Sequence, residues 1–160
     1  MKRWIIAAWL FTLVCVAYGV VGKERLIASG DVVYLRLAPV DPRSMMQGDY
    51  MALDFALAGD VARDRGYDAS REQLVVIRVD DKKEGHFARL YTDQPLAANE
   101  RLLRVQNVRS GNGVQISTNA WFFQEGQGER FQAARFGEFR VGAGGEALLV
   151  GMRDEKLNPL

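Results

Sequence analysis

Cysteine, histidine and proline are scarce in this chain of 160 residues, and each scarcity excludes a class of function. The single cysteine, Cys15, lies inside a long apolar run, so the rest of the chain has no thiol for a disulfide, a nucleophile or a zinc ligand. The single histidine, His86, excludes a histidine-rich metal site, and in a turn it is typical of a solvated side chain. Because only four residues are proline and 48% are apolar, a packed core is favoured over disorder. We therefore expect no metal centre and no cofactor.

An excess of charge of one sign is also missing. The formal net charge is +1, and setting aside Lys2 and Arg3 reduces the 21 basic residues to 19, one fewer than the 20 acidic residues. A balanced domain has no overall field that attracts a polyanion, so we expect no nucleic-acid partner.

The clearest positive signal is the apolar run Trp4–Val21, which holds eighteen residues and no charge. At 1.5 Å per residue a helix of this length spans about 27 Å, close to the hydrocarbon thickness of a bilayer. Trp4 and Tyr18 lie near its two ends, where amphipathic rings prefer to sit. The run predicts a transmembrane anchor over residues 1–22, with residues 4–21 in contact with membrane lipid.

Two other interpretations of this run stay open. Ala17-Tyr18-Gly19 offers a small-x-small site for cleavage of a signal peptide, although the apolar stretch before it is longer than a typical signal core. A buried core helix is the third interpretation, which the tryptophans close to Lys2-Arg3 disfavour.

The order of segments predicts the side of the membrane on which the protein folds. A long domain after a single short anchor favours a cytoplasmic N-terminus, and Lys2 and Arg3 add a slight positive-inside bias. We expect a single-pass protein of the bacterial inner membrane, with residues 23–30 as a stalk and residues 31–160 as one extracytoplasmic, periplasmic domain.

Beyond the stalk, apolar and polar residues alternate in short segments separated by Gly- and Asp-containing turns. This predicts a β-rich α+β fold, in which the single transmembrane helix is followed by one antiparallel-sheet domain with a short helix at residues 129–136. The predicted strands are 32–37, 51–57, 74–79, 87–91, 102–108, 113–117, 139–141 and 147–152. We expect the first two to be neighbours in one sheet and residues 59–72 to form a polar surface connection, in which one helical turn is an open alternative.

A distinctive corner precedes the second predicted strand. Asp41-Pro42 fits the start of a type I turn, Gly48 suits a sharp reversal, and Asp49 and Tyr50 can cap amides and bury a ring. These roles are structural. The functional alternative is a polar notch that a partner or ligand enters, for which the candidate binding residues are Asp41, Arg43, Gly48, Asp49 and Tyr50.

The same residues carry a resemblance to a known family. Gly48-Asp49-Tyr50-Met51-Ala52-Leu53-Asp54-Phe55, with the turn before it, resembles the signature of the GDYXXLXY family, although Phe55 stands in place of the final Tyr. Trp121-Phe122-Phe123-Gln124-Glu125-Gly126 resembles a late aromatic segment of these proteins. The resemblance implies a membrane-anchored outer domain, found beside multi-pass membrane proteins, and it implies no reaction. We therefore expect a non-catalytic accessory domain that partners a multi-pass membrane protein.

Two alternatives belong to other functional classes. Ser44-Met45 ahead of Gly48-Asp49 faintly resembles type I signal peptidases, which would make Ser44 the nucleophile of a membrane-bound hydrolase. Its spacing is shorter than in those enzymes, and no lysine lies in an apolar strand where its pKa would fall. The second alternative is a small-ligand sensor that uses the notch near Asp49 and Tyr50.

Three consecutive aromatic residues, Trp121-Phe122-Phe123, form the last candidate feature. Because side chains alternate along a strand, the three rings cannot share one face. Either all are covered, in part by the predicted helix 129–136, or part of the run is an exposed surface for docking a membrane partner.

Overall fold

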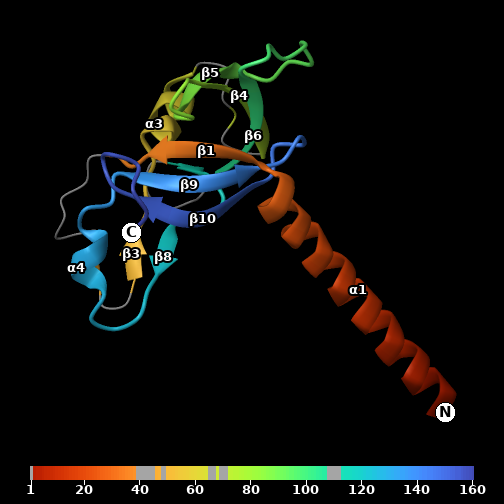
Figure 1. The fold of residues 1–160 in the computed structure, drawn as a ribbon. Helices are drawn as coiled ribbons and strands as arrows, with labels where there is room; N and C mark the ends of the chain where they lie inside the picture. The colour runs from red at the N-terminus through yellow and green to blue at the C-terminus, as the bar shows by residue number, and fades with distance from the viewer. Residues whose placement is uncertain (1, 39–45, 48–49, 65–67, 69–71, 108–112) are drawn as a thin grey trace.

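The chain forms a long N-terminal helix joined to a β-rich body (Figure 1). The structure is a computed structural model, and it describes residues 2–38, 46–47, 50–64, 68, 72–107 and 113–160. Its helices are α1 (Lys2–Ser29), α3 (Ala56–Arg63) and α4 (Gly128–Phe131). Its strands are β1 (Asp31–Arg36), β2 (Met46–Gln47), β3 (Tyr50–Ala52), β4 (Gln73–Val79), β5 (Gly85–Leu90), β6 (Glu100–Asn107), β7 (Val114–Gln115), β8 (Ala120–Phe122), β9 (Phe136–Val141) and β10 (Ala147–Arg153).

Helix α1 runs without a break through both the predicted anchor and the predicted stalk. It ends where the amide of Gly30 donates to the carbonyl of Leu26 at 2.9 Å, and β1 begins at the next residue. None of Lys2–Ser29 is buried, so the interpretation as a core helix is wrong. Its length and apolar composition fit a membrane span, and they equally fit a signal sequence.

The first sheet has the strand order β1-β9-β10, all antiparallel. The alternation predicted for residues 32–37 is confirmed, because Val33, Leu35 and Leu37 all point into the core. The predicted C-terminal hairpin is confirmed as β9 and β10. The opposite face of this sheet holds one buried charge, Glu138, which accepts hydrogen bonds from two guanidinium nitrogens of Arg153.

The second sheet has the order β5-β4-β6-β7, and both hairpins predicted between residues 74 and 117 are confirmed in it. It meets the first sheet at β1, where the amide of Tyr34 donates to the carbonyl of Lys83 at 2.8 Å. The turn between β9 and β10 also contacts this sheet, because the amide of Arg104 donates to the carbonyl of Gly145 at 2.8 Å.

The third sheet has the order β2-β3-β8, and it corrects two predictions. Residues 51–57 are not one strand beside β1, because β3 ends at Ala52 and α3 begins at Ala56. In the described part of the chain, this segment is paired with the residues after β1 by a single bridge between Leu37 and Phe55. The reason is a change of period, because α3 buries Leu57, Ala58 and Val61, a helical spacing. Part of the predicted polar connection 59–72 is therefore helical.

The predicted helix 129–136 is also wrong in extent, because α4 covers only Gly128–Phe131 and Phe136 already begins β9. Residues 132–133 form a turn after α4, and the buried residues Ala134 and Phe136 follow it at the two-residue spacing of a strand.

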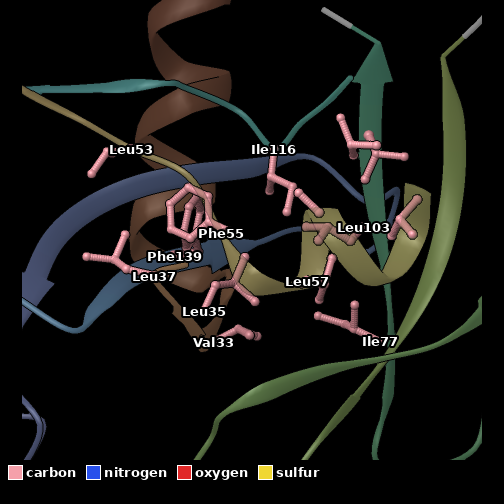
Figure 2. Packing of buried hydrophobic residues seen from close by; sticks show 14 of the residues in the cluster. Val33, Leu35, Leu37, Leu53, Phe55, Leu57, Ile77, Leu103, Ile116 and Phe139 are labelled. Carbon is pink, nitrogen blue, oxygen red and sulfur yellow. The ribbon is translucent and has the colours of Figure 1, made fainter. Parts of the chain in front are cut away.

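The core lies between the sheets and α3 (Figure 2). Phe55 and Phe139 meet edge to face, with ring centroids 5.3 Å apart. Gly137 makes this contact possible, because a Cβ there would lie 3.0 Å from a ring atom of each. The centre of the core thus joins the segment after β3 to the first sheet.

Candidate functional site

The structure describes one of the five predicted binding residues, Tyr50. Asp41, Arg43, Gly48 and Asp49 lie outside the described residues, and so does Ser44, the alternative nucleophile. Tyr50 is therefore the predicted binding residue whose surroundings the structure describes.

Tyr50 is the first residue of β3, the central strand of the third sheet. It pairs with Gln47 of β2 on one side and with Phe122 of β8 on the other. The Tyr50 and Phe122 rings lie 5.7 Å apart between centroids, with a tilt of 40°. Tyr50 is half-buried, whereas Phe122 is 74% exposed. We call these two rings the Tyr50/Phe122 surface.

Strand alternation explains why Phe122 faces outward. Its neighbours Trp121 and Phe123 turn to the opposite side, where both contact Phe131 of α4. The Phe123 and Phe131 rings stack at 5.1 Å, and the Trp121 ring lies 6.2 Å from Phe131. Trp121 and Phe123 are therefore partly covered, and Phe122 is exposed.

Sequence reasoning treated the corner and the aromatic run as separate features. The pairing of β3 with β8 brings Tyr50 and Phe122 together across about seventy positions of the chain. No local pattern signals that pairing, because period-two alternation shows that a segment is a strand and says nothing about its neighbour.

One cluster of chemically active side chains lies elsewhere in the described part of the chain, at the turn between β4 and β5. Asp80, Glu84 and His86 each offer one side-chain oxygen or nitrogen that could bind a metal ion, and these atoms lie within 4.8 Å of one another. The Asp80 carboxylate accepts the amides of Lys82 and Glu84, both at 2.8 Å, and the Glu84 carboxylate accepts from Arg36 Nε at 3.1 Å. These contacts explain the cluster as a hydrogen-bonded hairpin turn.

The pKa shifts at this turn agree with that role. Desolvation acts to raise the pKa of the Asp80 carboxyl, but the Glu84 and Lys82 amides and nearby His86 outweigh it, and the pKa falls below its usual value. The hydrogen bond to Glu84 is the largest cause that raises the pKa of Arg36. Both shifts favour the charged forms that the turn uses.

Comparison with known proteins supplies the remaining observation. A model of the GDYXXLXY protein family matches residues 12–152, nearly the whole chain. The chain belongs to the GDYXXLXY family. No curated protein and no solved structure matches it. In this GDYXXLXY protein, Tyr50 of the signature lies in the third sheet, beside the exposed ring of Phe122.

Phe55, which replaces the signature's final Tyr, is 3% exposed, with its ring against Phe139. An apolar ring suits that position, because a buried hydroxyl would need a hydrogen-bond partner. Among the described signature residues, Tyr50 is therefore the aromatic one that keeps part of its ring in contact with solvent.

Proposed function

We propose that this GDYXXLXY protein is a membrane-tethered accessory domain that binds an extracytoplasmic part of a multi-pass membrane protein through the Tyr50/Phe122 surface. In this proposal α1 is a single-pass anchor in the bacterial inner membrane, and residues 31–160 lie in the periplasm. The protein acts by binding rather than by catalysis.

The exposure of Phe122 carries the proposal. A phenylalanine ring that is 74% exposed leaves apolar area in water, and burying such area against a partner releases about 25 cal/mol per Å². Tyr50, half-buried beside it, supplies a second ring that is already held in place. Rigid aromatic side chains of this kind are the usual centres of protein interfaces.

The end of α1 packs against the domain, which supports a direct coupling of the proposed anchor to the domain. Leu26, in the last turns of the helix, is half-buried, and its Cδ1 lies 3.1 Å from the position a Cβ would take on Gly142. A guanidinium nitrogen of Arg140 also donates to the carbonyl of Gly30 at 3.4 Å. The helix end thus packs on β9 and its turn as part of the domain.

Single-cysteine labelling tests the anchor and its orientation. Cys15 is the only cysteine, so Cys15→Ser gives a background without thiols. In that background we expect Ala133→Cys, at an exposed site, to react with a membrane-impermeant maleimide on intact spheroplasts. Lys2→Cys should react only after the membrane is opened. The opposite pattern would contradict the periplasmic placement.

Site-specific photocrosslinking tests the docking surface. We expect a photoreactive phenylalanine analogue at position 122 to join this protein to a multi-pass membrane protein in intact cells, while the same analogue at Gln132 does not. Tyr50→Ala should lower the yield at position 122 by removing the adjacent ring. Equal yields at positions 122 and 132, or no adduct at position 122, would contradict docking at this surface.

A further inference from the structure

A pocket lies where α1 joins the domain, and we call it the junction pocket. Its volume is about 540 Å³, within the range of roughly 300–1,000 Å³ typical of ligand sites. The lining residues that matter for its chemistry are Leu26, Asp31, Leu96, Ala98, Arg101 and Val141.

The pocket occupies the end of the domain that faces α1. Its walls come from the last turns of α1, the start of β1, the start of β6 and the end of β9, which meet where the helix leaves the body (Figure 1). Leu26 lies five residues beyond Val21, the end of the apolar run, which is about 7.5 Å along a helix. The headgroup layer on each side of a bilayer is of similar thickness, about 5–7.5 Å. A spanning α1 would therefore hold the lower edge of the pocket at the level of the lipid headgroups.

The chemistry of the lining is amphipathic and carries both signs of charge. Leu26, Leu96 and Val141 supply apolar surface. Asp31 and Arg101 form an ion pair at 2.5 Å whose side chains remain 56% and 36% exposed. Arg101 is held in place, because its Nη1 donates to the carbonyls of Ala98 and Glu100, both at 2.8 Å.

A fixed guanidinium beside an exposed carboxylate matches a zwitterion. Because Nε and Nη1 of Arg101 already donate to Asp31 and to backbone carbonyls, its Nη2 group is the one that can donate to a phosphate, while the Asp31 carboxylate can accept an ammonium group. A headgroup with a phosphate and an ammonium a few bonds apart meets both, while its glycerol region contacts the leucines. An anionic headgroup without an amine would leave Asp31 facing a like charge.

We propose that the junction pocket binds the headgroup of a zwitterionic phospholipid, of the phosphatidylethanolamine type, from the leaflet next to the C-terminal end of α1. This inference rests on the proposed function, because the leaflet lies beside the pocket only when α1 spans the membrane. The bound lipid would fix the height and tilt of the domain above the bilayer.

Lipid photolabelling of the full-length protein tests the inference. The protein is placed in nanodiscs of phosphatidylethanolamine and phosphatidylglycerol that contain phosphatidylethanolamine with a diazirine at the headgroup, and adducts are mapped by mass spectrometry. We expect adducts on α1 and on residues 141–143 of the pocket wall. Ala98→Trp fills the pocket from an exposed position and should lower the adducts on residues 141–143 at least roughly tenfold, the change that a loss of about 1.4 kcal/mol produces. Ala62→Trp, on an exposed position of α3, is the matched control and should leave them unchanged.

Each other outcome identifies what fails. Adducts on α1 with none on the pocket wall, or wall adducts that Ala98→Trp leaves unchanged, would overturn the pocket and leave the anchor standing. A phosphatidylglycerol probe that labels residues 141–143 equally would overturn the zwitterionic assignment. No adduct anywhere on α1, including its two ends at the headgroup level, would contradict the membrane anchor of the proposed function itself. Asp31→Asn removes the ammonium partner with almost no change of volume, and it should also reduce labelling of the wall.

Discussion

Gly85 shows how one missing side chain sets the distance between two sheets. It is the first residue of β5 and is buried against β1. A Cβ at this position would lie 2.8 Å from Val33 Cγ1 and 3.0 Å from Leu35 Cδ2, closer than side chains approach one another. The inward alternation of β1 was predictable from the sequence, but the need for glycine opposite it was not, because it depends on a contact between distant segments.

We expect Gly85→Ala to lower the free energy of unfolding by about 1–3 kcal/mol, since the added methyl group overpacks the core. Gly59→Ala is the matched control: Gly59 lies inside α3, its Cβ would meet only Arg63 at 3.6 Å, and alanine should stabilise the helix by about 0.5–1 kcal/mol. Urea unfolding of the full chain in detergent, followed by circular dichroism, measures both. Destabilisation of equal size in the two variants would contradict the close packing at Gly85.

At the scale of elements, the sequence predicted segments that keep one period and failed where the period changes. Strands β4, β5, β6 and β10 each alternate or run apolar between clear turns, and the hairpins β4–β5, β6–β7 and β9–β10 followed from the short connections between their strands. The pattern from Met51 to Leu57 predicts one strand, because its apolar residues recur every second position. From Leu57 onward, the buried residues follow the helical spacing of α3 instead. The length of α4 was overestimated, because contacts of Phe131 with two aromatic rings of the preceding segment stabilise this short helix, and helical periodicity does not.

The aromatic cluster of β8 and α4 gives a prediction at this scale. Phe131 is 5% exposed and contacts both Trp121 and Phe123, so Phe131→Ala should lower the free energy of unfolding by about 3–5 kcal/mol. Phe122 follows Trp121 in β8 and points to the opposite face, so Phe122→Ala should change the free energy of unfolding by less than about 0.5 kcal/mol. The same urea titrations compare the two. A large loss in Phe122→Ala would mean that this ring supports the fold and would weaken its assignment as a docking surface.

At the scale of the whole molecule, the sequence predicted an apolar helix followed by a β-rich domain, but it did not predict how the two are joined. In residues 23–30, the predicted stalk, α1 continues to Ser29, and β1 begins after Gly30 alone. The contacts of Gly30 explain the tight junction, because its missing Cβ leaves room for the carbonyl of Leu26 and for Arg140. With so short a connection, we expect α1 and the domain to move as one unit, so that the junction pocket and the Tyr50/Phe122 surface keep fixed positions relative to α1.

The last prediction tests this coupling through the two glycines near the end of α1. A Cβ on Gly30 would lie 2.5 Å from the carbonyl oxygen of Leu26, so Gly30→Ala should break the packing of the helix end on β9. Trypsin cleaves after Lys23 and Arg25, and we expect it to cut the Gly30→Ala protein in detergent roughly tenfold faster for each 1.4 kcal/mol lost from the free energy of local opening. Gly22→Ala is the control, because nothing lies within 4 Å of its Cβ and alanine strengthens the helix, so cleavage should not increase. Equal cleavage of both variants and of the natural sequence would show that the domain does not depend on this junction for its placement.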